Sequence, residues 1–387
     1  MTDPTRQRFS FAPPVAHYHL TGGVQLVHGA NKLGWMIDTD TDKLNVFSTL
    51  SGDPEDILTH YPDIKVMARN RYKRPEETED AVSEIFVLRA TNGENQCLAF
   101  SQHTFWSGIA QGFHSDGLSD HAMMARRLTT QIVKTLRRFE KLSNSYRIAI
   151  AAADAAPSEG ISFVQNKYAS NVGHEFGSFL DDLYALRDAI NAIIHKIHLK
   201  ADVSFSTKNF KKKLETAPVS ALTKMIQGSM FDPTAGDLIV SHMSTYRAVA
   251  IHSLGTSNPV SGDSLVTKFA DGPIGRVSWL VYPLYDDMEK LKEIEFGASG
   301  SVFEKMEFEE FKRFATLEKH IDAMDFGYRC FVRLLQTADL LGSELGMTPR
   351  HLTITDKDIL SAEFRDEDGN RKRLHRDGLT GELVERD

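Results

Sequence analysis

The chain has 387 residues, of which 41% are hydrophobic and 25% charged, with 13 prolines and 26 glycines. This balance is typical of a globular protein and excludes a collagen-like or mostly disordered chain. The formal net charge is −8, so a nucleic-acid partner would need a local basic patch. The two cysteines, Cys97 and Cys330, are too few for a disulfide framework or a thiolate zinc site.

No apolar run approaches the roughly 20 residues with which a helix crosses a bilayer. The first residues also lack the apolar segment of a signal peptide. We therefore expect a cytoplasmic protein with no membrane partner.

Residues 1–115 mix short apolar stretches with glycine and proline, which predicts a mixed α+β N-terminal module. Within it, two β-prone runs flank Asn92-Gly93. This pair tolerates the positive φ angles of a type I′ turn, so we expect a hairpin over 84–101.

Residues 116–346 are predicted to form a helical bundle, because apolar residues recur there every three or four positions. One helix is expected from Ser119 to just before Pro157, and a second over about 170–198. Three further helical stretches are expected: 207–228 with an interruption at Pro218, one from near Pro233 to Gly255, and one that starts at Ser301 with a Ser301–Glu304 capping box and ends near Gly346.

Two segments are expected to contain β-structure or irregular structure. The apolar run 277–282 fits a strand or a packed loop. Residues 347–387 form a charged tail in which Asp368-Gly369 suggests a small hairpin. The predicted fold class is therefore mainly α: a helical bundle with an appended N-terminal α+β module and a small C-terminal β-hairpin.

Arg247 and His252 form the most informative motif, five residues apart and close to the helix end that Gly255 marks. Five helical residues turn the side-chain direction by about 140°, so the two share a groove only if the helix ends or tightens near His252. A permanently charged arginine beside a histidine that titrates near neutrality can hold a phosphodiester and move its protons. The expected chemistry is attack by an RNA 2′-hydroxyl on the adjacent phosphorus, without a metal.

This stretch resembles the Arg-x4-His signature of the HEPN superfamily, all-α proteins of which many members are metal-independent ribonucleases. The resemblance covers the motif and the helical order over about 117–255. It implies that Arg247 stabilises the phosphate and that His252 acts as general acid or base, with no cofactor. It also implies a homodimer that joins two motifs in one site, and an RNA-directed toxin or defence role. Ala248 departs from the family, which usually has a polar residue there.

Basic residues gather at two places in this acidic chain. One stripe on the first long helix follows seven-, four- and three-residue steps, and a second group lies near 208–213. Either could follow an RNA backbone. The candidate nucleic-acid-binding residues are Arg127, Lys134, Arg138, Lys211 and Lys212, with Lys141, Lys208 and Lys213 beside them.

Two other hypotheses stay open. The first is a non-catalytic helical module that binds a ligand or a protein, with Arg247 paired to an acidic neighbour and His252 favoured by the helix dipole. The second is a metal-dependent hydrolase, since His195 and His198 share one helix face. Because no third ligand is obvious, we expect no metal site. No P-loop or nucleophile elbow occurs in the sequence.

Overall fold

A computed structural model of the chain describes residues 14–21, 25–29, 33–38, 43–48, 66–71, 85–87, 98–154, 161–165, 167–201, 205–231, 239–252, 264–272, 275–285, 320–350, 361–365, 371–376 and 383–386. These residues are mostly helical. The predicted mainly-α class is therefore confirmed for the part of the chain that is described.

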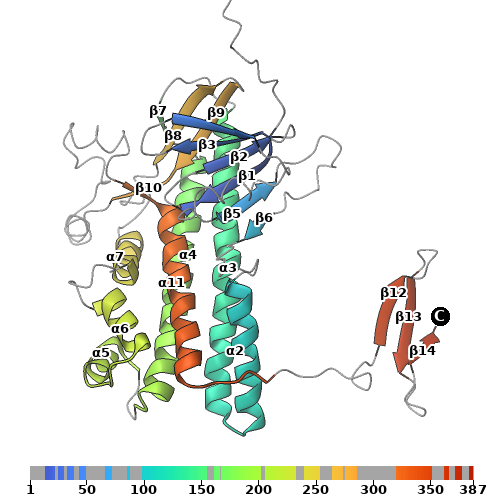
Figure 1. Ribbon diagram of the computed structural model, residues 1–387, viewed down its shortest axis with the longest axis vertical. Helices are drawn as coiled ribbons and strands as arrows, with labels where there is room; N and C mark the ends of the chain where they lie inside the picture. Colours follow the sequence, from blue (N-terminus) through green and yellow to red (C-terminus); the bar gives the residue numbers. More distant parts are fainter. Residues whose placement is uncertain are drawn as a thin grey trace, which may run out of the picture.

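Four long helices form the centre of the molecule (Figure 1). They are α2 (Leu98–Ser115), α3 (Ser119–Asp154), α4 (Lys167–Ile193) and α11 (Ala323–Glu344). Helix α3 packs between α2 and α4, while α11 lies against α4. The helices predicted from Ser119 and over 170–198 are confirmed. The second of them ends in the π-helix η2 (Ile194–His198).

Apolar side chains at helical spacing explain why these helices pack together. On α3, Leu128, Ile132 and Leu136 are almost fully buried, as the three- and four-residue steps predict. Aromatic rings join the helices: Phe179 of α4 lies 5.3 Å from Phe139 of α3 and 6.3 Å from Phe331 of α11, centroid to centroid. The core is thus continuous across three helices.

Three shorter helices lie on the side of α4 away from α2 (Figure 1). They are α5 (Thr207–Glu215), α6 (Ala221–Ile226) and α7 (Ile239–His252), with the π-helix η3 (Gln227–Phe231) after α6. Ser206 caps α5, and Ser220 caps α6 in a capping box with Thr223. The interruption predicted at Pro218 is confirmed. The described helix α7 falls within the span predicted from Pro233 to Gly255.

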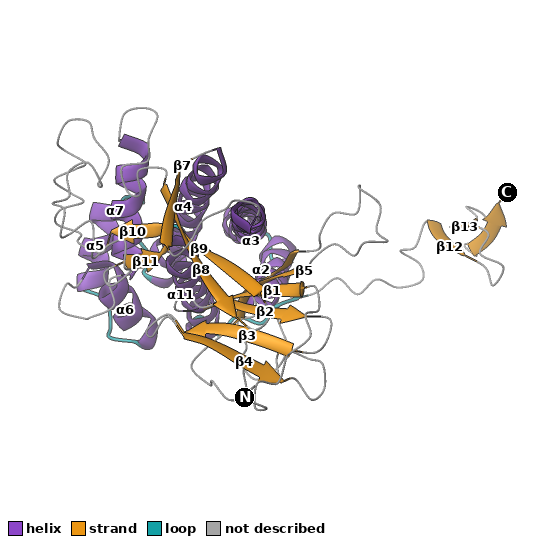
Figure 2. Cartoon of the chain, turned by 90° about the horizontal axis from the view of Figure 1, so that it is seen from above, coloured by secondary structure: helices purple, strands orange, loops and turns teal. Residues whose placement is uncertain are grey.

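Antiparallel strands cover one end of the bundle, as the view from above shows (Figure 2). The largest sheet has the order β4-β3-β2-β1-β5-β6. Its strands are β1 (Pro14–Leu20), β2 (Gln25–Gly29), β3 (Leu33–Asp38), β4 (Lys43–Ser48), β5 (Val66–Arg71) and β6 (Ile85–Val87). Strand β1 contacts the end of α3, where the ring of His19 meets Tyr146 edge to face.

Three smaller sheets come from later parts of the chain. The first joins β7 (Ile161–Gln165), β8 (Ser264–Gly272) and β9 (Gly275–Val281), so the run at 277–282 is mostly strand rather than a packed loop. The second pairs β10 (Pro283–Tyr285) with β11 (His320–Asp322). The third joins β12 (Ser361–Arg365), β13 (Arg371–Arg376) and β14 (Leu383–Arg386), and its first pair flanks Asp368-Gly369.

Two predicted elements are wrong in part. The hairpin over 84–101 is wrong from Leu98 onward, where helix α2 begins and buries Ala99, Gln102 and Trp106 at helical spacing. Residues 88–97 lie outside the described residues. The single helix from Ser301 to Gly346 is wrong at His320–Asp322, which form β11 and pair with β10. The capping box at Ser301 lies outside the described residues. Helix α11 is capped instead by Asp322, which accepts a hydrogen bond from the Asp325 backbone N–H.

Two glycines in helix interiors give a matched test of the packing between α4 and α11. A Cβ on Gly327 would lie 2.6 Å from Cε1 of Phe179, whereas no described atom lies within 4 Å of a Cβ on Gly177. Phe179 is fully buried between other rings and has no room to move aside. We expect Gly327→Ala to lower the free energy of unfolding by about 1–2 kcal/mol, because overpacking outweighs the gain in helix propensity.

Gly177→Ala is expected to raise the free energy of unfolding by up to about 1 kcal/mol, since only the helix propensity changes. Urea denaturation of the two variants beside the wild type measures both effects. Equal effects of the two substitutions would contradict the tight contact at Gly327.

Candidate functional site

Arg247 lies on α7 and points toward α4. Its Nε donates a hydrogen bond to Oδ1 of Asp181 at 2.8 Å, and its guanidinium carbon lies 4.2 Å from the centroid of the Tyr184 ring. The Arg247 side chain keeps 33% of its surface exposed and that of Asp181 keeps 50%. The arginine is thus held in place by an acid and an aromatic ring, yet remains accessible to a ligand.

A second arginine stacks on the same ring. The guanidinium carbon of Arg187 lies 3.7 Å from the Tyr184 centroid. Its Nη2 and Nε donate to Oδ1 of Asp188, at 2.8 and 3.2 Å, and its Nη1 donates to Oγ of Ser244 at 2.8 Å. Because Ser244 belongs to α7, this contact also fixes α7 against α4.

The electrostatics of this cluster are balanced. Two guanidinium groups beside one ring repel each other, and the carboxylates of Asp181 and Asp188 offset that repulsion. The face of the tyrosine ring adds attraction for both cations. The result is two oriented cations, one nearly buried and one partly exposed, in a form that suits the oxygens of a phosphate. We refer to Arg187, Arg247 and Tyr184 as the paired-arginine site.

His252 is the last residue of the described helix α7, but its side chain lies outside the described part of the structure. Its Cα lies about 7.5 Å further along the helix axis than that of Arg247, given the rise of an α-helix. That Arg247 and His252 face one groove therefore stays a prediction. Ala248, which follows Arg247, is half-buried and offers no polar group.

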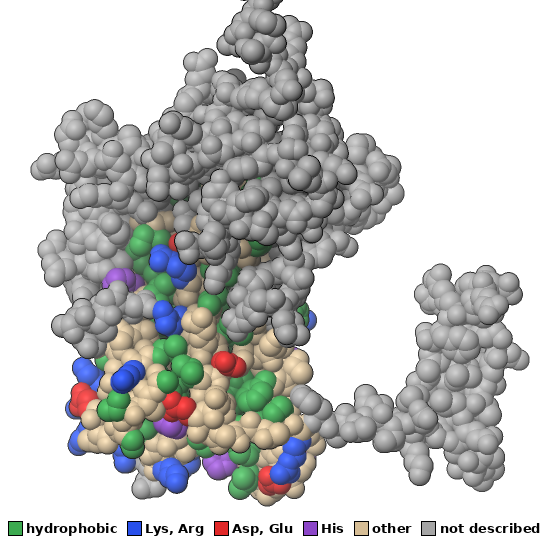
Figure 3. Space-filling model, in the orientation of Figure 1, with side chains coloured by type: hydrophobic (Ala, Val, Ile, Leu, Met, Phe, Trp, Pro, Cys, Tyr) green, Lys and Arg blue, Asp and Glu red, His purple; other side chains and the backbone are tan. Residues whose placement is uncertain are grey.

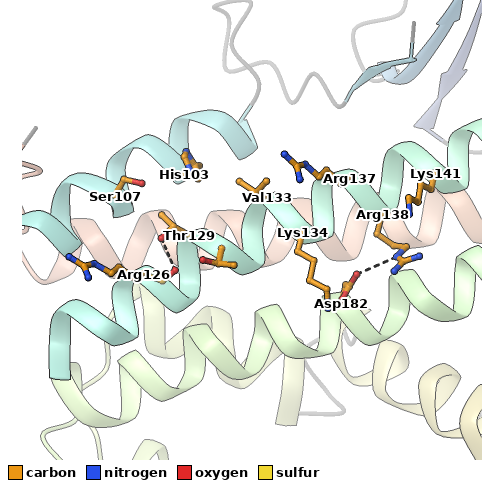
Figure 4. A pocket seen from close by; sticks show the side chains of 11 residues that line it. His103, Ser107, Arg126, Thr129, Val133, Lys134, Arg137, Arg138, Lys141 and Asp182 are labelled. Carbon is orange, nitrogen blue, oxygen red and sulfur yellow. Dashed lines mark hydrogen bonds and ion pairs between the residues drawn. The ribbon is translucent and has the colours of Figure 1, made fainter. Parts of the chain in front are cut away.

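A second basic feature is a groove along α3, which we call the α3 groove. It has a volume of about 860 Å³. Figure 4 shows side chains of α2 and α3 on its two walls, with Asp182 of α4 at its lower edge. The lining residues are His103, Ser107, Arg126, Thr129, Thr130, Val133, Lys134, Arg137, Arg138, Lys141 and Asp182.

The predicted basic stripe partly coincides with this groove. Lys134, Arg138 and Lys141 line it, whereas Arg127 is exposed but does not line it. Sequence reasoning missed Arg126 and Arg137, which do line it. They are eleven residues apart, close to three full turns, so the helical period places them on one side of α3.

Two of the groove cations are fixed by acids of α4. Lys134 Nζ lies 2.7 Å from Oδ1 of Asp182. Arg138 contacts Oε2 of Glu175 at 3.1 Å and Oδ2 of Asp182 at 3.4 Å. Burial alone would lower the pKa of Arg138, but the hydrogen bonds and charges of Glu175 and Asp182 raise it overall. Both side chains are therefore held in place by carboxylates of α4.

The candidate nucleic-acid-binding lysines of α5 lie outside the α3 groove. Lys211 and Lys212 are exposed, and Lys211 Nζ is 5.8 Å from the centroid of the Phe231 ring. Helix α5 and helix α2 lie on opposite sides of α4 (Figures 1 and 2). The two predicted basic groups therefore do not form one surface. On the described part of the face seen in Figure 3, Lys and Arg side chains are scattered among acidic and apolar ones.

The histidine pair in η2, His195 and His198, does not form a metal site with described residues. His195 is buried in η2, where its ring meets Phe205 and Phe210 edge to face. Burial lowers its pKa, and the charges of Lys213 and Lys196 lower it further. His198 Nε2 instead lies 3.7 Å from Oε2 of Glu344. In the described ranges, no three His, Cys, Asp or Glu side chains gather as metal ligands would.

A comparison of the chain with protein-family models, curated proteins and solved structures finds no significant match. Among the described helices, none is both long and apolar enough to span a membrane.

Proposed function

We propose that the chain is a metal-independent RNA endonuclease that uses Arg247 and His252. The observation that carries this proposal is the stacking of two guanidinium groups on Tyr184, with Arg247 still partly exposed. Oriented cations of this kind stabilise the charge that develops on phosphate oxygens in a transition state. The resemblance of Arg247–His252 to the HEPN signature supports the same reading.

The reaction needs one bond to form and one to break. The 2′-oxygen of a ribose attacks the neighbouring phosphorus while the bond from phosphorus to the 5′-oxygen breaks, which leaves a 2′,3′-cyclic phosphate and a 5′-hydroxyl. His252 acts as the base for the 2′-hydroxyl or as the acid for the 5′-oxygen. In the homodimer that the resemblance implies, the second motif supplies the other group. Arg247 binds the non-bridging oxygens.

A non-catalytic helical module is the second candidate function. The ion pair between Arg247 and Asp181 favours it, because a phosphate has to compete with that carboxylate. The apolar Ala248 next to Arg247 favours it as well.

Cleavage of chemically matched oligonucleotides tests the proposal. The full-length protein is incubated in EDTA with an RNA strand and with the same strand carrying 2′-O-methyl groups. We expect cleavage of the RNA alone, with 2′,3′-cyclic phosphate ends, because the methyl group removes the nucleophile. Cleavage of the methylated strand, or cleavage that needs added metal, would overturn this mechanism. Binding without cleavage would favour the non-catalytic module.

A further inference from the structure

We propose that the α3 groove binds the phosphate backbone of single-stranded RNA at a surface separate from the paired-arginine site. The inference rests on the proposed function for its choice of RNA as the polyanion. Its physical basis is independent, because it comes from the shape and charge of the groove.

The groove concentrates positive charge in a chain whose net charge is negative. Of the described residues that line it, five are Lys or Arg and one is a carboxylate, and four of the five cations are exposed. A polyanion gains little from the protein as a whole, which carries a formal charge of −8. A polyanion in the groove is therefore held by local attraction to these cations.

The cations form a row rather than a cluster. From Arg126 to Lys141 the helix rises by about 22 Å. A single small anion would occupy only part of this length, whereas consecutive phosphates of one strand can follow it. Figure 4 shows Arg126 toward one end of the groove and Lys141 toward the other, with Lys134 and Arg138 between them.

The acids near the groove orient its cations without neutralising the row. Asp182 has only 5% of its side chain exposed and contacts both Lys134 and Arg138. Burial raises the pKa of Glu140 overall, although the nearby charge of Arg137 acts to lower it. Arg126 and Lys141 form no ion pair within the described ranges. The two ends of the row therefore carry charge that no described carboxylate pairs.

The polar lining suits a sugar–phosphate strand better than stacked bases. The hydroxyls of Ser107 and Thr130 are exposed at the wall and can donate to phosphate or ribose oxygens. Among the described residues that line the groove there is no Phe, Tyr or Trp, so these residues offer no ring on which a base can stack, as bases do in many single-strand-binding proteins. Binding should thus depend strongly on salt and weakly on base sequence.

Salt-dependent binding of a labelled single-stranded RNA tests this inference. The assay uses the full-length protein with His252→Ala, so that the RNA stays intact. In this background, Arg126→Glu with Lys141→Glu is expected to weaken binding by about tenfold or more and to reduce the slope of log K against log salt by about 1.4. The matched control reverses two exposed lysines outside the groove and outside the predicted basic groups, Lys196→Glu with Lys224→Glu, and should change the affinity less than about threefold.

Several outcomes would overturn the inference. Equal losses in the groove variant and the Lys196→Glu with Lys224→Glu control would mean that only net charge matters. Inorganic polyphosphate that binds as tightly as RNA, and competes with it, would mark a general anion site.

Thermal unfolding of each variant, followed by circular dichroism, shows whether the helices are intact. If the groove variant is unfolded, Arg126→Gln with Lys141→Gln replaces it, with an expected loss of about threefold or more.

The groove and the proposed catalysis can fail separately. A wild type that does not cleave RNA, but binds it in a manner that depends on Arg126 and Lys141, would overturn the proposed function and support the groove. RNA cleavage that disappears with His252→Ala would support the proposed function. If RNA binding in the same experiments does not change with the charges of Arg126 and Lys141, the inference about the groove is overturned.

Discussion

Replacing His252 by alanine is expected to lower RNA cleavage by about 10²–10⁴-fold, the usual contribution of a general acid or base. The helical content should stay the same, because alanine favours a helix and His252 is the last residue of the described α7. Single-turnover cleavage in EDTA measures the rate, and circular dichroism measures the helix. Cleavage at the wild-type rate would remove His252 from the mechanism.

Arg247→Ala should reduce the same rate by about 10²–10³-fold, because a charged donor to the transition state is lost. Arg247→Lys keeps the charge but loses the planar group that stacks on Tyr184. Its rate should lie between those of the wild type and the alanine variant. Arg350→Ala is the matched control, since Arg350 is an exposed arginine that also pairs with an aspartate, Asp116 at 2.7 Å. A loss of activity in this control would show that the assay reports general damage.

Asp322→Ala is expected to lower the free energy of unfolding by about 2–4 kcal/mol, through loss of a helix cap and of buried hydrogen bonds. Asp322 accepts hydrogen bonds from the Tyr146 hydroxyl at 2.8 Å, and from the backbone N–H groups of Tyr282 and Asp325 at 3.2 Å. One carboxylate thus joins α3, the β9–β10 connection and α11. Chemical denaturation measures the loss. An effect below about 0.5 kcal/mol, the size typical of a surface change, would contradict this role.

The same residue should make stability depend on pH. Burial raises the pKa of Asp322 to about 7, and the charge of Asp325 raises it too, while its hydrogen bonds act in the opposite direction. The folded state therefore binds the proton more tightly than the unfolded chain, whose pKa is near 3.8. The contribution of Asp322 to stability is complete below about pH 4 and is lost as the pH rises toward about 7.

Asp322→Asn isolates this effect, because the amide does not titrate. From pH 5 to pH 7.5, the wild type should lose stability relative to the asparagine variant. Asp116→Asn, at an exposed carboxylate, serves as the control and should follow the wild type. Parallel profiles for the wild type and Asp322→Asn would contradict the raised pKa.

Local periodicity was sufficient to predict the long helices. The stripe from Leu128 to Ile150 on α3 is buried along its length, because every third or fourth residue faces the same neighbours. Strand β11 could not be found in this way. It is three residues long and exists through pairing with β10, some 35 residues earlier in the chain. The start of α2 was visible in principle, since Ala99, Gln102 and Trp106 have helical spacing.

The candidate site was predictable to a smaller extent. The helical period alone placed Lys134, Arg138 and Lys141 on one stripe, and the groove follows it. The second arginine of the paired-arginine site was not predicted as a partner of Arg247, because their meeting depends on how α4 and α7 pack. Sequence spacing relates residues within one helix and carries no information about such a crossing.

The paired-arginine site joins side chains of two helices, so the pairing of its arginines is conditional. Arg187 and Tyr184 both belong to α4, so their contact persists in any state in which α4 is intact. Arg247 reaches the ring only from α7. If α7 separates from α4, even briefly, the two cations move apart and Arg187 alone remains beside Tyr184. Docking of this one short helix thus acts as an assembly step for the arginine pair.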